Sequence, residues 1–154
     1  MAQSGKKWWN YMLKGEYNHT IDSKGRIIVP TKLREELGDS FVVTKGLDGC
    51  LWMFDATEWA KVEAEIQAMP FTLKEARMLS RFMIAGAYDA EPDKQGRMLI
   101  PPALREYAGI DKDVVLAGVG SRVELWSKER YENASDFGDM DEMAEKLIEL
   151  GFRL

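Results

Sequence analysis

The chain has 154 residues, of which 45% are hydrophobic and 31% are charged, and its mean hydropathy is −0.33. This composition is typical of a soluble domain with a packed core, and no apolar run approaches the roughly 20 residues that cross a bilayer, which excludes a membrane span. Cys50 is the single cysteine and cannot form an internal disulfide, and the first residues lack the apolar block of a secretory signal. We therefore expect a cytoplasmic protein.

The formal net charge of −5 is unevenly distributed along the chain. Residues 1–35 contain seven basic and three acidic side chains, whereas residues 136–154 contain two basic and six acidic ones. Because physiological salt screens charges over roughly 8 Å, a local basic surface can attract a polyanion while distant acids dominate the total. The charge balance therefore leaves nucleic acid open as a partner.

One phrase of the sequence occurs twice. "DSKGRIIVP" at residues 22–30 and "DKQGRMLIP" at residues 93–101 align at an offset of 71. The match extends upstream ("GEYNHTID" and "GAYDAEPD") and downstream ("PTKLREELG" and "PPALREYAG"), then continues at an offset of 72. Two copies of a unit of about 45 residues are too few for a solenoid, so the repeat predicts a pseudo-symmetric pair that shares one core.

In each copy the pattern predicts an extended segment, a glycine turn, a short strand, a short helix and a β-hairpin. Gly25 and Gly96 can adopt positive φ in the turns, and Pro30 and Pro101 end the strands because proline cannot donate to a sheet. The expected extended segments are residues 15–21 and 86–92, and the expected helices are residues 31–37 and 102–108. The units are therefore mostly β, with "LDGC" at residues 47–50 as the Asp-Gly turn of the first hairpin.

Three further helices are expected outside the repeated phrase. Capping-box spacing predicts helix starts at Asp55, Thr72 and Asp139, and the last helix, about residues 139–150, has Met143, Leu147 and Leu150 on one side. Packing of all three helices on the sheets is the favoured interpretation. An intersubunit surface is the alternative.

The sequence contains no pattern typical of catalysis. His19 is the only histidine, which excludes a histidine-based zinc cluster, and Cys50 beside a hairpin turn suits structural packing better than a reactive thiol. We found no phosphate-binding loop, no serine elbow and no spaced set of metal ligands. The sequence therefore favours a binding protein over an enzyme and predicts no cofactor and no metal.

The repeated turn is the best candidate for binding. Asp22 and Asp93 can accept backbone hydrogen bonds two residues on and so shape the turns around Gly25 and Gly96. Basic side chains project from the turns and the adjoining elements, in a pattern that suits a phosphate backbone: Lys24, Arg26, Lys32 and Arg34 in the first copy, and Lys94, Arg97 and Arg105 in the second. An internal ion pair of Arg26 with Asp22, and of Arg97 with Asp93, is an equally weighted alternative.

The phrase "DKQGRMLIPPALREYAGIDKD" resembles the AbrB-type swapped-hairpin DNA-binding domain. Together with "GEYNHTIDSKGRIIVPTKLREELG", it makes a tandem pair that is similar to the MraZ family of bacterial transcriptional regulators, over about residues 12–131. The Asp-x-x-x-Arg motif of that family falls on Asp22 with Arg26 and on Asp93 with Arg97.

The resemblance implies an α+β, mostly β fold in which two swapped-hairpin units form a pseudo-symmetric barrel with peripheral helices. The expected segments are a first unit (12–60), connecting helices (61–85), a second unit (86–135) and a C-terminal helix (136–154). It also implies a ring of eight or more subunits that binds double-stranded DNA at the nucleoid, at direct repeats upstream of its own cell-division and cell-wall gene cluster. No membrane and no small-molecule substrate are expected.

Two alternatives stay open at this point. Swapped-hairpin domains also occur in antitoxins, and the acidic segment 136–154 could bind a protein partner instead. Residues 1–11 precede the family pattern, and their Lys6, Lys7, Trp8 and Trp9 either contact DNA or belong to a disordered tail, which is the favoured interpretation.

Overall fold

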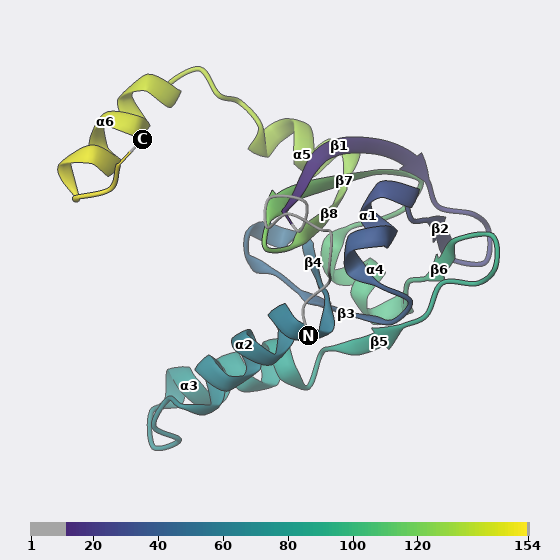
Figure 1. The fold of residues 1–154 in the computed structure, drawn as a ribbon, viewed down its shortest axis with the longest axis horizontal. Helices are drawn as coiled ribbons and strands as arrows, with labels where there is room; N and C mark the ends of the chain where they lie inside the picture. The colour runs from purple at the N-terminus through teal and green to yellow at the C-terminus, as the bar shows by residue number, and fades with distance from the viewer. Residues whose placement is uncertain (1–11, 154) are drawn as a thin grey trace, which may run out of the picture.

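The computed structural model describes residues 12–153, so Lys6, Lys7, Trp8 and Trp9 lie outside the described residues. It is an α+β fold with a strand-rich body from which helices project (Figure 1). The strands are β1 (Leu13–Thr20), β2 (Arg26–Ile28), β3 (Phe41–Lys45), β4 (Leu51–Phe54), β5 (Tyr88–Ala90), β6 (Arg97–Leu99), β7 (Asp113–Gly120) and β8 (Val123–Ser127). The helices are α1 (Thr31–Leu37), α2 (Ala56–Gln67), α3 (Lys74–Leu79), α4 (Pro102–Ala108), α5 (Lys128–Ala134) and α6 (Met140–Glu149), with a 3-10 turn η2 (Leu47–Gly49) and a π-helical turn η3 (Ser80–Ile84).

The sheet topology is pseudo-symmetric. Six strands form an antiparallel sheet in the order β1-β7-β8-β4-β3-β5, and β2 pairs with β6 in a separate two-stranded ribbon. Exchanging the repeats replaces β1 by β5, β3 by β7 and β4 by β8, which turns the strand order into its own reverse. The two copies therefore occupy equivalent places, and the β2–β6 ribbon contains one strand from each.

The six-stranded sheet has two edges, β1 and β5, within the described residues. Closure into a barrel therefore stays a prediction, as does the division of the chain into four segments. The expected common core is present, because one buried cluster joins side chains of both copies. It includes Ile27 and Val43 from the first copy and Met98 and Leu116 from the second, each no more than 1% exposed.

The short helices α1 and α4 have the predicted boundaries. Pro102 occupies the first turn of α4, where a missing N–H costs no hydrogen bond. Gly38 and Gly109 follow the two helices with φ of 90° and 66°, values that suit glycine after a helix. The Asp-Gly turn is also confirmed, since Asp48 and Gly49 have φ of 66° and 81°.

The predicted capping boxes are confirmed at only one of three positions. The Asp55 side chain accepts a 2.7 Å hydrogen bond from the Glu58 backbone N–H and caps α2. Thr72 does not cap α3, which begins at Lys74 after an uncapped Leu73, and Asp139 precedes α6 without a side-chain cap. These two predictions are wrong because the chain near Thr72 turns before the helix starts and the Asp139 backbone is not extended, with φ of −110° and ψ of 29°.

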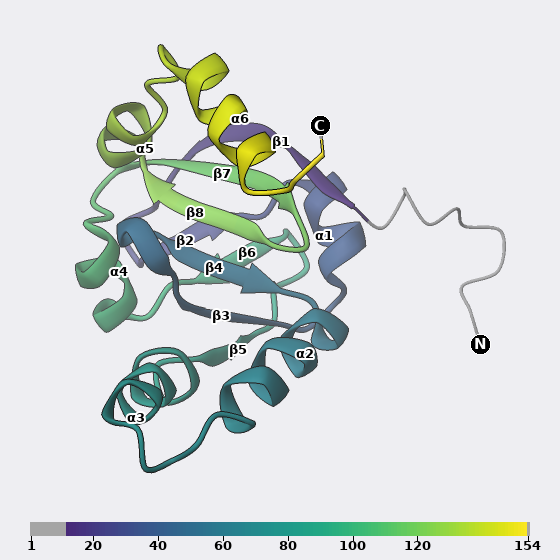
Figure 2. The same cartoon turned by 90° about the vertical axis from the view of Figure 1, so that its left-hand side faces the viewer.

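The helices differ in how far they pack on the body. α2 buries Ile66, and the segment from α3 through η3 buries Ala76 and Met83, each 5% exposed or less. α6 buries no side chain and stands apart from the sheet in Figure 1, whereas in Figure 2, where that side of the molecule faces the viewer, it is drawn in front of β1. The prediction that all three helices pack on the sheets is therefore wrong for α6. No helix of residues 12–153 combines the length and the apolar character that a membrane span needs.

Candidate nucleic-acid interface

Two equivalent turns, residues 22–26 and 93–97, lead into the two strands of the ribbon. In the first turn, Asp22 Oδ1 accepts hydrogen bonds of 2.9 Å from the backbone N–H groups of Lys24 and Arg26. The second turn repeats the arrangement at 2.9 Å with Asp93, Gln95 and Arg97. Each aspartate thus holds its turn as an Asx-turn acceptor.

The same aspartates also hold the arginines. Arg26 Nε donates to Asp22 Oδ2 at 2.9 Å, and Arg97 Nε donates to Asp93 Oδ2 at 2.8 Å. The ion pair across the turn, one of the two expected roles of these arginines, is therefore present in both copies. It engages only Nε, because the two terminal nitrogens of each guanidinium have no hydrogen-bond partner among residues 12–153. The Arg26 and Arg97 side chains are 26% and 34% exposed, so solvent reaches both.

Hydrogen bonding favours the ionised form of the two aspartates. The Arg26 backbone N–H is the largest influence that lowers the pKa of Asp22 below its ordinary value of 3.8, and the Arg97 backbone N–H does the same for the pKa of Asp93. Each carboxylate therefore keeps its charge to a lower pH than an ordinary aspartate does, and it fixes the orientation of its arginine.

The turn glycines allow a close approach between the two copies. Gly25 and Gly96 have φ of 80° and 81°, a backbone conformation that residues other than glycine rarely adopt. A Cβ at Gly25 would lie 2.9 Å from Cζ of Arg105, and a Cβ at Gly96 would lie 2.5 Å from Nη1 of Arg34. Glycine therefore lets a guanidinium group of the other copy lie directly over each turn.

Each turn is completed by the other copy. Chain order groups Arg34 with the first turn, whereas the structure places it at the second, beside Asp93 and Lys94. The backbone crosses in the same way, since Val29 N–H donates to Gly96 O and Ile100 N–H donates to Gly25 O, both at 2.8 Å. We define the first turn site as Lys24, Arg26 and Arg105, and the second turn site as Lys94, Arg97 and Arg34.

The remaining predicted cations differ in their surroundings. Lys24 and Lys94 are exposed at the turns. Arg105 is half-buried, and its buried Nε has no hydrogen-bond partner within the described residues. Lys32 is exposed on α1, but it lies two residues before Arg34 and so points to a different side of the helix. The structure therefore brings six of the seven cations to the turns and leaves Lys32 apart.

The ribbon also presents two apolar side chains that sequence reasoning missed. Ile27 and Met98 point into the core, so their neighbours in the alternating strand pattern point outward. On that outer face Arg26 lies opposite Leu99, and Ile28 lies opposite Arg97. Ile28 and Leu99 are 48% and 52% exposed. The alternation in "RII" and "RML" was the signal that could have identified them.

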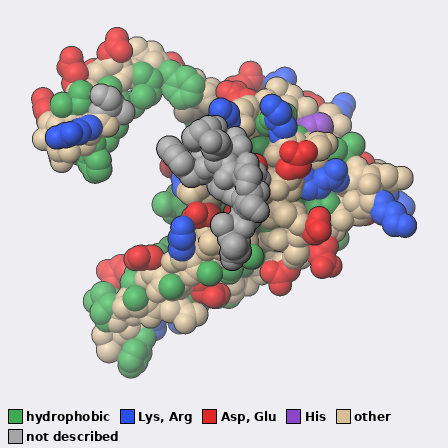
Figure 3. Space-filling model, in the orientation of Figure 1, with side chains coloured by type: hydrophobic (Ala, Val, Ile, Leu, Met, Phe, Trp, Pro, Cys, Tyr) green, Lys and Arg blue, Asp and Glu red, His purple; other side chains and the backbone are tan. Residues whose placement is uncertain are grey.

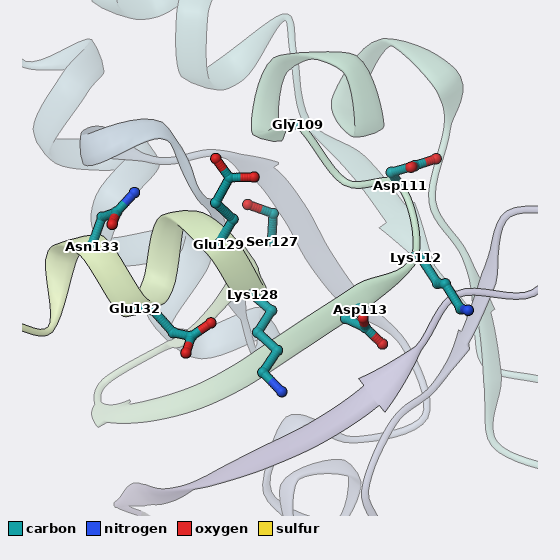
Figure 4. A pocket seen from close by; sticks show the side chains of 9 residues that line it. All are labelled: Gly109, Asp111, Lys112, Asp113, Ser127, Lys128, Glu129, Glu132 and Asn133. Atoms are coloured by element: carbon teal, nitrogen blue, oxygen red, sulfur yellow. The ribbon is translucent and has the colours of Figure 1, made fainter.

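A surface cleft away from the turns has a different character. It is formed by the segment after α4, by the start of β7 and by α5 (Figure 4), and four carboxylates and two lysines are among its lining residues: Gly109, Asp111, Lys112, Asp113, Ser127, Lys128, Glu129, Glu132 and Asn133. An excess of carboxylates disfavours a polyanion. Among residues 12–153, no cluster of three or more His, Cys, Asp or Glu side chains is arranged to hold a metal ion.

The two side chains considered for catalysis differ in their surroundings. Cys50 is fully buried, its thiol donates to Leu47 O at 3.3 Å, and burial raises its pKa to about 12. A thiolate is therefore scarce at neutral pH. His19 is half-buried in β1 and lines a shallow cavity with Asp113 and Lys128.

Comparison with known proteins identifies the family. The family model described as "MraZ protein, putative antitoxin-like" matches this chain twice, at residues 12–82 and 83–147. The chain belongs to the MraZ family. The two matches meet inside η3, between residues 82 and 83, so each contains one turn, one ribbon strand and the short helix after it.

MraZ relatives are similar over nearly their whole length. The transcriptional regulator MraZ of Thermoanaerobacter sp. (strain X514) is 54% identical over 141 residues, covering 90% of this chain and 99% of the relative. Its counterparts in Lachnoclostridium phytofermentans and Acetivibrio thermocellus are 54% and 50% identical, each over 91% of this chain. These relatives are named as regulators and not as enzymes.

Proposed function

We propose that this member of the MraZ family is a DNA-binding transcriptional regulator that holds the phosphate backbone with its two turn sites. The observation that supports this most strongly is the arrangement of Arg26 and Arg97, in which aspartate fixes Nε while the terminal nitrogens lack protein partners among residues 12–153. A guanidinium group fixed in this way loses little further freedom when it donates to a phosphate. Two such groups on one ribbon favour a polyanion as the ligand.

The exposed apolar side chains on the ribbon, Ile28 and Leu99, would allow the protein to distinguish one DNA sequence from another. Phosphate contacts position a protein on DNA, whereas base edges supply sequence information. A two-stranded ribbon fits the major groove, where the thymine methyl group offers an apolar contact. Ile28 and Leu99, exposed between Arg26 and Arg97, would make that contact while the arginines bind the flanking phosphates.

Assembly would raise the affinity of these sites. We place the protein in the cytoplasm at the nucleoid, as a ring of eight or more subunits bound to direct repeats upstream of its own cell-division and cell-wall gene cluster. Once one subunit is bound, its neighbours face the next repeats at a high effective concentration. Regularly spaced subunits therefore favour regularly spaced DNA boxes.

The test is a salt titration of DNA binding by the Arg26→Ala and Arg97→Ala variants. Neutralising one phosphate changes the slope of log affinity against log salt by about 0.9, so each variant should bind more weakly and with a shallower slope. Circular dichroism should show a retained fold, because the backbone bonds to Asp22 and Asp93 do not involve the guanidinium groups.

Asp22→Asn is the matched control for the ion pair. It removes the carboxylate charge but keeps an oxygen for the Asx-turn, so the charge of Arg26 is no longer offset. The amide nitrogen that replaces Oδ2 cannot accept from Arg26 Nε, so this variant keeps the positive charge of Arg26 but loses its fixed orientation. DNA affinity should therefore fall less in this variant than in Arg26→Ala, and the salt slope should stay that of the wild type. Equal affinity and equal slope in the wild type and both arginine variants would contradict the proposal and leave the arginines with a purely structural role.

A protein-binding, antitoxin-like function is the second candidate. Two observations favour it: the words "antitoxin-like" in the description of the family model, and the apolar face of α6, of which no side chain is buried among the described residues. This function predicts a second protein that copurifies in fixed ratio, together with no retention on heparin at low salt. Retention on heparin by a single pure species supports DNA binding instead.

A further inference from the structure

The two turns are equivalent in sequence but are attached to the six-stranded sheet in different ways. β1 has eight residues, Leu13–Thr20, and the next residue, Ile21, donates its N–H to Lys112 O at 2.8 Å. β5 has only three residues, Tyr88–Ala90, and the repeat places Pro92 at the position of Ile21. Because proline has no N–H, the second turn cannot make the same bond. The second turn therefore lacks part of the backbone pairing that holds the first.

A tyrosine side chain fastens the second turn instead. The Tyr88 hydroxyl donates a hydrogen bond to Leu99 O, which joins the start of β5 to the end of β6. The turn at residues 93–97 lies between these two residues, so the bond closes the segment at its base. Burial raises the pKa of the half-buried Tyr88 above its ordinary value, so the phenol keeps its proton and donates at neutral pH.

The equivalent tyrosine of the first copy has different surroundings. Tyr17 matches Tyr88 in the repeat, but its ring lies against its own strand, since a Cβ at Gly15 would be 3.4 Å from Cε1 and from the hydroxyl oxygen of Tyr17. Within residues 12–153 the Tyr17 hydroxyl has no hydrogen-bond partner, and no side chain donates to Ile28 O, the counterpart of Leu99 O. Over this part of the chain, a tyrosine thus ties β6 to the sheet but leaves β2 untied.

The residue that Tyr88 holds lies on the proposed DNA-binding face. Leu99 is 52% exposed and lies opposite Arg26 on the ribbon. Figure 3 shows Lys and Arg side chains at the end of the molecule that carries the two turns. A recognition contact needs its residue held to within about 0.5 Å, and a hydrogen bond to the backbone of that residue restricts its position. The fastened strand β6 is therefore better placed than β2 to make a specific apolar contact.

We propose that Tyr88 is a positioning residue for sequence recognition, whose bond to Leu99 O fixes the Leu99 side chain against a thymine methyl group. Base pairs beside β6 are then distinguished more strictly than base pairs beside β2, although the two strands are equivalent in the repeat. The inference rests on the proposed function, in which Leu99 makes an apolar contact in the major groove. Tyr88 acts through Leu99 and does not itself contact DNA.

The test removes thymine methyl groups one at a time. In the DNA sequence that the protein selects, each thymine is replaced in turn by uracil, which lacks only the methyl group. A methyl group buried against Leu99 should contribute about fourfold to affinity. The thymine that Leu99 contacts is identified as the one whose methyl contribution disappears in the Leu99→Ser variant.

Tyr88→Phe removes only the hydroxyl group that makes the bond. The methyl contribution at the Leu99 thymine should fall from about fourfold to below about twofold in this variant. The salt slope should stay that of the wild type, because Asp93 still holds Arg97. A purely structural role would lower the affinity for all duplexes alike and leave the methyl contribution unchanged. Tyr17→Phe is the matched control and should keep the fourfold contribution.

A double variant separates positioning from general weakening. Adding Tyr88→Phe to Leu99→Ser should change no methyl contribution further, because the contact that Tyr88 positions is already absent. A full fourfold contribution in Tyr88→Phe would overturn the inference, as would an equal reduction in Tyr17→Phe or a selected DNA in which no thymine responds to Leu99→Ser. The salt slopes of Arg26→Ala and Arg97→Ala are measured separately, so binding by the turn sites can stand where this inference fails.

Discussion

At the scale of single residues, the turns show that an internal ion pair of Arg26 or Arg97 leaves room for a ligand contact by the same arginine, although the sequence presents these two roles as alternatives. Asp22 binds the backbone through one oxygen and Arg26 Nε through the other, so the ion pair and the Asx-turn share one carboxylate. Because the pair engages only Nε, a structural arginine keeps donors for a ligand. The internal partner thereby orients the proposed contact and does not compete with it.

Substitution of the turn glycine Gly25 should have two effects that can be measured separately, one on stability and one on the position of Arg105. Gly25→Ala should lower the free energy of unfolding by about 1–3 kcal/mol because its φ of 80° is unfavourable for alanine. The new methyl group would also displace the Arg105 guanidinium, now 2.9 Å from that position, and should weaken DNA binding. Urea unfolding and a DNA titration measure the two effects.

Gly120→Ala is the control for this variant. Gly120 has φ of 100°, and within residues 12–153 only Met12 Cε, at 3.6 Å, lies near a Cβ there. It should therefore lose similar stability while DNA affinity is kept. Equal loss of affinity in the two variants would mean that strain alone, and not Arg105, weakens binding.

At the scale of elements, the β2–β6 ribbon combines the two copies on one surface. Its inner residues, Ile27 and Met98, anchor it to the core, and its outer face alternates arginine with an exposed aliphatic residue. A three-residue strand is too short to be stable alone, so the anchoring side chains are what hold this face in place.

The apolar residues of the ribbon should affect sequence preference more than charge-driven binding. Ile28→Ser and Leu99→Ser should each lower the preference for the selected sequence over unrelated DNA by about 1–3 kcal/mol, with an unchanged salt slope. Competition titrations with two DNA duplexes measure this preference. Val119→Ser removes a 45% exposed apolar side chain from β7 and should leave the preference unchanged. A shallower salt slope in the Ile28 or Leu99 variant would instead point to a displaced arginine.

At the scale of the whole molecule, the two copies form one folding unit. Ile27 and Met98 face each other directly across the ribbon and lie in a single buried cluster. Val29 and Ile100 extend the link by donating to the opposite turns. Each turn is therefore completed by residues of the other copy.

Core variants should therefore destabilise both copies together. Ile27→Ala and Met98→Ala should each cost about 2–5 kcal/mol, in a single calorimetric transition. Because the two side chains are in contact, the double variant should differ from the sum of the single effects by about 0.5–3 kcal/mol. Two separate transitions, or strict additivity, would indicate that the copies fold independently.

The sequence by itself determined the local features of this protein. The repeat, the boundaries of α1 and α4, the Asp-Gly turn and the Asx-turn residues follow from interactions within a few residues of the chain, which a sequence records directly. The failures of Thr72 and Asp139 as caps show the limit of such signals, because the path of the neighbouring chain decides whether a capping residue can reach its target.

Only the tertiary structure decided how the two copies are combined. The crossing of Arg34 and Arg105 to opposite turns depends on pairing between strands about 70 residues apart, and no short-range pattern encodes such a contact. The same is true of α6, whose apolar stripe predicts burial but whose position away from the sheet leaves it exposed. Short-range interactions thus determined the turns and the short helices, and long-range packing assembled the candidate site from both halves of the chain.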